Sequence, residues 1–210
     1  MIKKGLFIVV DGPSASGKDT VVRQVLKDLK SLNVEAISIQ ETKEKKYDRE
    51  KILSAKQHGD QEVAETIIEE RKKLYRTRVI PQLTVGTLVI VNRGEPATLA
   101  YQTIKNEITM GNIWNMHRQQ QIPLPDLVVI TNCSVREAGR RENLRETPSE
   151  EKNKNLMSGK FTSARKRVHA NYKIVKDFLE KKGLAVIYLK TDTMNMSETS
   201  QKIVNFIKIR

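Results

Sequence analysis

The sequence predicts an α/β fold of three layers, in which a five-stranded parallel sheet is flanked by helices. Five short runs are almost continuously apolar, as is typical of parallel strands that are buried on both faces. Helical stretches alternate with these runs, and such alternation favours a doubly wound sheet. A length of 210 residues fits one compact domain over residues 1–210.

The five predicted strands are rich in β-branched and apolar residues. In chain order they are GLFIVV (5–10), EAISIQ (35–40), TLVIVN (87–92), LVVITN (127–132) and LAVIYL (184–189). Between them, apolar side chains at helical spacing predict helices over residues 18–33 and 160–182. The motif SVRE at 134–137 is a capping box, which predicts the start of another helix.

Two segments fit this alternation poorly. Residues 41–60 and 145–160 are polar and weakly periodic, so we expect them to leave the core as mobile excursions. The alternative is that both are variable surface loops.

The charge of the chain favours a polyanionic partner. Lys and Arg total 38 against 25 for Asp and Glu, a net charge of +13, which suits nucleotides, nucleic acid or an anionic membrane face. Phe, Trp and Tyr make up only 5% of the residues, and no basic stretch is interleaved with aromatic ones, which argues against nucleic acid. The most basic cluster, SARKRVHANYKIVK (163–176), is interpreted as a solvated helix face.

Cysteine content and hydropathy predict a cytoplasmic protein. The single cysteine, Cys133, excludes an internal disulfide and favours a reducing compartment. No apolar run near the start approaches the roughly 20 residues that a membrane span needs, and no signal-peptide pattern is present. We therefore expect a soluble chain without a membrane partner.

The stretch GPSASGKDT carries the strongest functional signal. Gly12, four further residues, Gly17 and Lys18 follow a predicted strand and open a predicted helix, which is the context of a phosphate-binding loop. Backbone N–H groups and the helix start would hold phosphate, and the lysine would neutralise its charge. The alternative is a glycine-rich turn with a solvated lysine. The predicted residues for ATP in this loop are Gly12, Ser14, Ala15, Ser16, Gly17, Lys18, Asp19 and Thr20.

The loop departs from the usual pattern at the position that normally binds Mg²⁺. Asp19 stands where Ser or Thr offers a hydroxyl, and Thr20 follows one place later. Asp11 ends the preceding strand and could face either a metal or the lysine. The candidate metal ligands are therefore Asp11, Asp19 and Thr20, although Asp19 could instead cap the helix start, where a negative charge is favourable.

A second stretch, VIPQLTVGTLVIVNRGEPATLAYQ (79–102), resembles the segment of thymidylate kinases in which a helix ends I-x-P-x-L-x-x-G, a strand follows, and DR opens a loop that closes with AYQ. PDL before the fourth strand, two arginines after it and the late-helix spacing from Phe161 to Tyr172 also match. The matching residues of the segment are Pro81, Leu83, Gly86, Arg93, Ala100, Tyr101 and Gln102.

The resemblance implies a three-layer P-loop kinase fold with a small lid, at about 140–160, and an acceptor-binding region at about 41–78. It implies transfer of the ATP γ-phosphate to a (deoxy)nucleoside monophosphate such as dTMP, with Mg²⁺, and a homodimer. Lys18 would hold the β and γ phosphates of ATP, and Arg93 the acceptor phosphate.

Further roles follow from the resemblance. Arg71 would contact the acceptor base. Ile67 occupies the position that would stack on this base. Thr98, Tyr101 and Tyr172 would line the acceptor pocket. The lid arginines would act on ATP or on the transferring group: these are Arg140, Arg141 and Arg145. Because Arg136/Arg140 and Arg141/Arg145 are i,i+4 pairs on different helix faces, not all four can point inward.

Four departures from the family pattern concern the acceptor or the metal. Ser14 replaces an acidic residue, Ile67 replaces the aromatic residue that stacks on thymine, Asn92 replaces the D of DR, and ETKEKKYD has no counterpart of the REPGG loop. We therefore expect phosphoryl transfer to survive better than thymidylate specificity. Two alternatives stay open: a P-loop kinase for another small acceptor, since GPSxSGKD also resembles guanylate-kinase relatives, and a nucleotide-binding protein without kinase activity.

Overall fold

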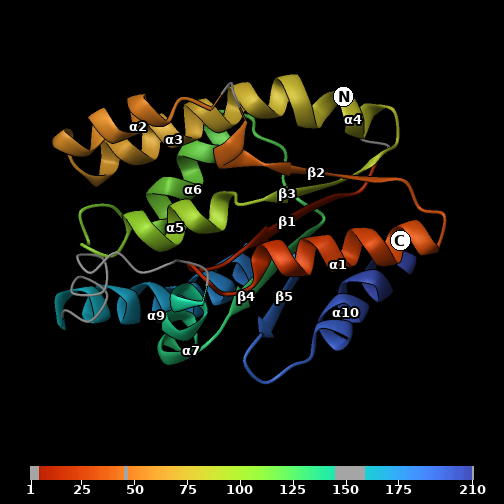
Figure 1. The fold of residues 1–210 in the computed structure, drawn as a ribbon. Coiled ribbons are helices and arrows are strands. Elements are labelled where there is room, and N and C mark those ends of the chain that lie inside the picture. Colours follow the sequence, from red (N-terminus) through yellow and green to blue (C-terminus); the bar gives the residue numbers. More distant parts are fainter. Residues whose placement is uncertain (1–4, 45–46, 145–158, 210) are drawn as a thin grey trace.

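The computed structural model describes residues 5–44, 47–144 and 159–209 and confirms the three-layer α/β fold (Figure 1). Its centre is one sheet of five parallel strands in the order β2–β3–β1–β4–β5. The strands are β1 (Phe7–Asp11), β2 (Ala36–Gln40), β3 (Leu88–Asn92), β4 (Leu127–Asn132) and β5 (Val186–Lys190). Each begins within two residues of its predicted run.

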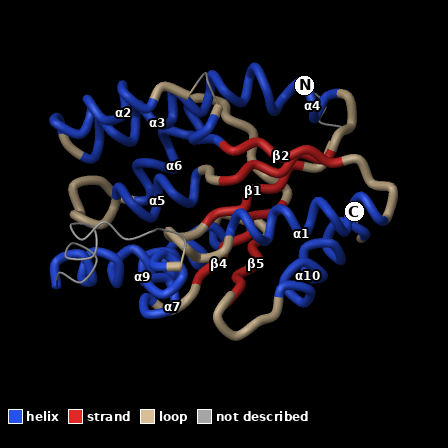
Figure 2. The backbone as a smooth tube through the Cα atoms, in the orientation of Figure 1, coloured by secondary structure: helices blue, strands red, loops and turns tan. Residues whose placement is uncertain are grey.

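Helices cover both faces of this sheet (Figure 2). Among the described residues the α-helices are α1 (Lys18–Ser31), α2 (Arg49–Ala55), α3 (Asp60–Leu74), α4 (Ile80–Thr84), α5 (Glu95–Gln102), α6 (Met110–Gln119), α7 (Val135–Asn143), α9 (Gly159–Lys181) and α10 (Met196–Lys208). Three short segments are wound differently: η1 (Glu41–Lys43) and η2 (Lys56–His58) are 3₁₀ turns, and η3 (Tyr75–Val79) is a π-helix. None of the described helices is long and apolar enough to cross a membrane.

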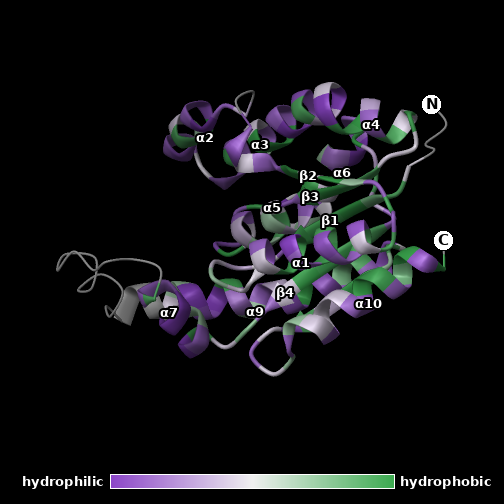
Figure 3. Ribbon diagram, turned by 45° about the vertical axis from the view of Figure 1, so that its right-hand side comes forward, coloured by the Kyte–Doolittle hydropathy of each residue, from purple (hydrophilic) through white to green (hydrophobic). Residues whose placement is uncertain are grey.

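Two hydrophobic cores form because successive side chains of a strand point to opposite faces of the sheet. Ile8 and Val10 of β1 pack with α1 and α10, where Leu29 and Ile203 are buried. Phe7 and Val9 instead face a larger core with residues of α3, α5, α6 and α9. In Figure 3 the strands accordingly run hydrophobic through the middle, while polar residues gather on the outer sides of the helices.

A continuous helical rod runs from α3 through η3 into α4. Pro81 lies in the first turn of α4; in a regular α-helix its ring would clash with the carbonyl four residues earlier, and it offers no N–H. The five residues of η3 relieve this conflict by widening the helix just before the proline. Tyr75 and Val79 stay buried despite the change of winding.

Residues 41–44 and 47–60 differ from their prediction, because they form η1, α2 and η2 and place Glu41 and Ala55 among the buried residues. The carboxylate of Asp48 accepts the backbone N–H of Lys51 at 2.9 Å and caps α2. Tyr47 beside it is buried. The other expected excursion and most of the predicted lid, with Arg145, lie outside the described residues.

Candidate active site

The loop between β1 and α1 takes its shape from two glycines. Gly12 has φ +151°, and a Cβ at this position would lie 2.1 Å from the carbonyl oxygen of Thr131. Gly17 has φ +91° at the start of α1. Residues that carry a side chain rarely adopt such backbone φ angles, so both positions require glycine. The loop therefore has the place and the shape that phosphate binding requires.

Lys18 places its charge over this loop. Its ammonium donates to the carbonyl oxygens of Gly12 at 2.8 Å and Pro13 at 2.7 Å, and the side chain is buried. Ser16 Oγ pairs with Thr131 Oγ1 at 2.7 Å and ties the loop to β4. With the N-terminus of α1, the ammonium makes the loop a positive cradle for phosphate.

Asp11 joins the loop to the segment after β3. Its Oδ1 accepts the N–H of Gly12 at 2.7 Å, and its Oδ2 accepts the N–H groups of Gly94 and Ala97, both at 2.9 Å. The hydroxyl of Tyr172 also donates to Oδ1, at 2.9 Å. These four donors occupy the carboxylate, so we remove Asp11 from the candidate metal ligands and assign it to holding the two loops together.

Tyr172 has a different place from the one predicted. It is fully buried and does not line the acceptor pocket. Its hydroxyl binds Asp11, and its ring meets the Tyr101 ring edge-on at 6.3 Å. Tyr172 therefore supports the pocket wall from behind, with Tyr101 in front.

Arg93 lies at the edge where both loops meet. It follows β3 directly, has φ +74°, and is held by its backbone N–H on the carbonyl of Val10 at 3.0 Å. Burial acts to lower the pKa of Arg93, but Asp11 and further neighbours, Glu41 among them, together outweigh it, so the pKa is raised. Among the described residues its guanidinium has no hydrogen-bond or ion-pair partner. A strained residue with a half-buried, unpaired cation marks a site for an anion.

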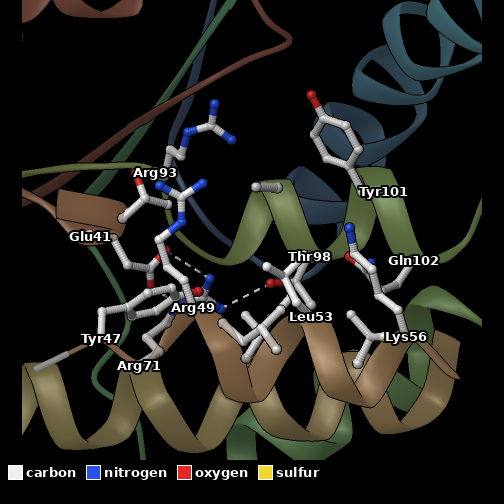
Figure 4. A pocket seen from close by; sticks show the side chains of 15 residues that line it. Glu41, Tyr47, Arg49, Leu53, Lys56, Arg71, Arg93, Thr98, Tyr101 and Gln102 are labelled. Atoms are coloured by element: carbon white, nitrogen blue, oxygen red, sulfur yellow. Dashed lines mark hydrogen bonds and ion pairs between the residues drawn. The ribbon is translucent and has the colours of Figure 1, made fainter. Parts of the chain in front are cut away.

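A pocket of about 310 Å³ opens beside Arg93, between α2, α3 and α5 (Figure 4). This volume lies in the range of small-ligand sites. Five predicted residues line it: Ile67, Arg71, Arg93, Thr98 and Tyr101. The sequence analysis missed most of the others, which are Glu41, Thr42, Tyr47, Arg49, Ile52, Leu53, Lys56, Val63 and Ala97, with Gln102 known only from the family motif.

Arg71 forms the floor of the pocket, where it is almost completely buried. Its Nε and Nη2 donate to the carboxylate of Glu41 at 2.6 and 3.1 Å. Nη1 donates to Thr98 Oγ1 at 3.1 Å and meets His117 Nε2 at 3.0 Å, while Nη2 also donates to the carbonyl of Gly94 at 2.9 Å.

These contacts use all five N–H donors that a guanidinium has. Burial acts to lower the pKa of Arg71, but Glu41 more than offsets it and keeps the arginine charged. Contact with an acceptor base would require Arg71 to give up one of its partners. Arg71 therefore has a structural role in this pocket, and its role in base recognition stays a prediction.

Two further polar groups lie under this floor. His117 Nε2 faces the Arg71 donor, which leaves the ring proton on Nδ1, and burial first, then Arg71, holds the pKa of His117 well below its usual range. His117 Nδ1 and Glu95 Oε1 are buried without a partner among the described residues. Burial raises the pKa of Glu95 to about 7. Both groups line a cavity of about 10 Å³, which is the space of one water molecule.

Arg49 adds a second cation to the pocket. It is the first residue of α2 and lines the same pocket as Arg93, and in Figure 4 the two guanidinium groups lie on the same side of it. Among the described residues Arg49 has no hydrogen-bond or ion-pair partner. The signal that could have found it is Asp48, a helix-capping residue directly before it.

The arginines of α7 lie on the other side of the phosphate loop. Ser134 Oγ accepts the N–H of Glu137, but the Glu137 carboxylate does not complete the capping box; it binds Arg140 and Arg141. Hydrogen bonds from Arg140 and then Arg141 hold the pKa of Glu137 at about 2. Arg140 otherwise faces solvent.

Arg141 is anchored beside the loop. Its guanidinium donates to Thr191 O at 2.7 Å, Thr191 Oγ1 at 3.0 Å and Ala15 O at 3.4 Å, as well as to Glu137 at 2.7 Å. It therefore ties the loop after β5 to the phosphate loop. Of the two predicted lid arginines that the structure describes, only Arg141 contacts the phosphate loop.

Asp19 and Asn92 meet directly. The Asn92 amide donates to Asp19 Oδ1 at 2.6 Å, from the end of β3 to the first turn of α1. Thr20 follows and accepts a long hydrogen bond from exposed Arg23, at 3.5 Å. The described residues contain no group of three or more His, Cys, Asp or Glu side chains that could hold a metal ion alone.

This fold and site define the P-loop class of nucleotide-binding proteins, with the phosphate loop after β1 and the pocket after β2 and β3 at the same end of the parallel sheet. A family model for thymidylate kinase matches residues 10–182. The chain belongs to the thymidylate kinase family.

Curated relatives agree with this family. The chain is similar to a thymidylate kinase of Clostridium novyi, with 33% identity over 106 residues, which cover 48% of this chain and 52% of that protein. A thymidylate kinase of Rickettsia bellii is 28% identical over 148 residues, covering 69% of this chain and 71% of that protein. A thymidylate kinase of Leptospira interrogans is 24% identical over 151 residues, covering 70% and 74%. The chain thus spans about half the length of the first relative and more than two thirds of the other two.

Proposed function

We propose that this chain transfers the γ-phosphate of ATP to a nucleoside monophosphate such as dTMP. The observation that carries the proposal is Asp11, whose carboxylate binds the phosphate loop through Gly12 and the Arg93 loop through Gly94 and Ala97. A donor phosphate and an acceptor phosphate held by these loops would lie at one edge of the sheet. Membership of the thymidylate kinase family supports the same reaction.

The donor side is assigned to the phosphate loop. Lys18 and the loop N–H groups would bind the β and γ phosphates, where Lys18 would exchange the carbonyls of Gly12 and Pro13 for phosphate oxygens. When bound, Mg²⁺ would neutralise charge on the phosphates. The residues that fit it are Asp19, Thr20 and Asn92, because Asn92 Oδ1 is a buried oxygen without a partner among the described residues.

The acceptor side is assigned to the pocket. Arg93 and Arg49 would hold the phosphate of the monophosphate, since both are cations without a partner among the described residues and both line the same pocket. Guanidinium groups suit this role because their donors match phosphate oxygens in pairs. Ile67, Thr98 and Tyr101 would surround the nucleoside.

The floor of the pocket favours weak discrimination among acceptor bases. Ile67 offers no aromatic face, and an interaction of roughly 1–3 kcal/mol is lost when a base has no ring to stack on. Arg71 has no free N–H for a base, because all five of its donors are used. We therefore propose that dTMP is one of several acceptors.

The test is to incubate the protein with ATP and Mg²⁺ against a panel of dTMP, dUMP, dCMP, dGMP and dAMP, and to follow ADP. Several monophosphates should be phosphorylated at comparable kcat/KM. An exclusive preference for dTMP would contradict the account of the base site. Binding of ATP without turnover of any acceptor would overturn the kinase function and favour a nucleotide-binding protein.

Oligomeric state and location stay predictions. The family resemblance implies a homodimer, which light scattering on the eluted protein would test. A cytoplasmic location rests on the hydropathy and the single cysteine, and fractionation of cells would test it.

A further inference from the structure

The contact between Asp19 and Asn92 lies where the phosphate loop, α1 and β3 meet. Asp19 is in the first turn of α1, one residue after Lys18, and Asn92 is the last residue of β3. Asn92 pairs in register with Val10 of β1, the strand that leads into the loop. Both side chains therefore lie at the end of the sheet to which the phosphate loop belongs.

P-loop enzymes usually divide the protein ligands of Mg²⁺ between these two places. The residue after the lysine supplies a neutral hydroxyl, and an aspartate at a strand end supplies the charge. In this chain the strand end carries neutral Asn92 and the loop carries charged Asp19. The usual pattern and this chain both carry one negative charge, but here the charge is on the phosphate loop instead of on the strand end.

The geometry of the pair leaves two oxygens for a cation. The Asn92 amide donates an N–H to Asp19 Oδ1. This hydrogen bond fixes the direction in which the Asn92 carbonyl oxygen, Oδ1, points. Asn92 Oδ1 is then buried without a partner among the described residues, in a side chain that is only 4% exposed. A buried oxygen without a donor is unfavourable unless water or a cation binds it. Asp19 Oδ2 has no protein donor in the described ranges either, although Asp19 itself is exposed.

The neighbouring carboxylates are committed elsewhere. Asp11 accepts four hydrogen bonds from the chain, and Glu137 is bound by Arg140 and Arg141. The Asp19 carboxylate, by contrast, accepts one hydrogen bond from the neutral amide of Asn92 and pairs with no cation in the described part of the chain.

We infer that Asp19 and Asn92 form an exchanged magnesium site, in which the loop carboxylate supplies the charge and the strand amide supplies a neutral oxygen. This rests on the proposed function, because the cation would arrive with a nucleotide. Mg²⁺ prefers hard oxygens and keeps several waters, so it needs only one or two protein groups, directly or through water.

The test measures metal in the nucleotide complex without any acceptor. The affinity for Mn²⁺, used as a probe for Mg²⁺, is followed by electron paramagnetic resonance in the presence of ADP, and ADP binding is measured in parallel with EDTA. The variants are Asp19→Asn, Asp19→Ser, Asn92→Asp and the exchange Asp19→Asn/Asn92→Asp. Glu198→Gln is the matched control, because Glu198 is also an acid in the first turn of a helix, α10, and its carboxylate accepts the N–H of Asn195 rather than a group of the phosphate loop.

Asp19→Asn and Asp19→Ser should weaken Mn²⁺ binding in the ADP complex by roughly tenfold or more, in line with losses of metal-site partners elsewhere. In EDTA the same variants should bind ADP as well as or better than the parent, because a negative charge next to phosphate has been removed. The exchange variant should recover Mn²⁺ affinity to within about threefold of the parent. Glu198→Gln should change neither measurement.

Several results would overturn the inference. Unchanged Mn²⁺ affinity in both Asp19 variants would leave Asp19 as a helix cap, and an exchange variant no better than the single one would mean that Asn92 does not share the site. Two substitutions at Asp19 guard against one that fails to fold. Because no acceptor is present, a chain that binds Mn²⁺ with ADP but phosphorylates nothing would refute the proposed function and leave this site standing.

Discussion

Glu41→Gln tests the floor of the acceptor pocket most directly. The substitution keeps the shape of the side chain and removes the negative charge that faces Arg71 at 2.6 and 3.1 Å. Both side chains are only 2% exposed, so water cannot replace the lost charge. The carboxamide also turns an N–H group toward the guanidinium, where a donor meets a donor.

The magnitude follows from the burial. Removing one partner of a buried ion pair leaves an uncompensated charge and costs about 3–5 kcal/mol. Domains are stable by roughly 5–15 kcal/mol in total, so the variant should lose a large share of its free energy of unfolding. With a urea dependence of roughly 2 kcal/mol per molar, the midpoint should fall by roughly 1.5–2.5 M.

Trp114 provides the readout. It is the only tryptophan of the chain, is buried, and lies on α6 with His117, which contacts Arg71. Urea unfolding followed by its fluorescence gives the midpoint of each variant. Glu69→Gln is the matched control, because Glu69 pairs with Lys51 at 2.8 Å but is 52% exposed, and exposed pairs contribute roughly 0–1 kcal/mol. A loss for Glu41→Gln no larger than that of the control would refute the buried pair.

Three further predictions concern the reaction and the pH dependence. Lys18→Ala should weaken ATP binding by about 1.5–3 kcal/mol in a titration and abolish transfer, because a charge-assisted contact to phosphate is lost; near-normal turnover would remove Lys18 from the mechanism. Arg93→Ala should raise KM for the monophosphate far more than for ATP, with partial rescue by Arg93→Lys, and equal effects on both substrates would show that the assignment is wrong. Burial raises the pKa of Glu95 from 4.5 to about 7, so the stability linked to its proton is present below pH 4.5 and is lost as the pH rises through about 7. Glu95→Gln should therefore be more stable than the parent at pH 8, by up to roughly 3 kcal/mol, and show no such advantage at pH 4.5; a difference that does not depend on pH would contradict this.

The strands and the helices α1 and α9 could be predicted because each carries its own signal, whereas α3 and α10 were not predicted from periodicity. Continuous apolar runs mark strands that are covered on both faces, and all five were found. Helix α2 was missed because its seven residues are too few for a periodic pattern, and only its cap, Asp48, announces it. The π-helix η3 was also missed. We attribute it to Pro81 alone, and a periodic pattern does not indicate such a local change of winding.

The site was predictable where one short motif contains it and not where distant segments combine. The phosphate loop lies within residues 12–20, whereas Glu41 and Arg71 are 30 positions apart and their pairing depends on how α3 packs. Tyr172 shows the two kinds of reasoning side by side. Helical spacing placed it on an apolar face, and it is fully buried; the pocket position implied by the resemblance was wrong.

The four hydrogen bonds of Asp11 make the spacing of two loops independent of the side chains that line the pocket. The spacing between the phosphate loop and the Arg93 loop is set by main-chain N–H groups that converge on the Asp11 carboxylate, and none of the side chains proposed to surround the nucleoside takes part. Replacements such as Ile67 can therefore accumulate on the wall of the pocket without altering the path along which phosphate would travel. A chain built in this way can change the base that it accepts while the proposed phosphoryl transfer stays the same.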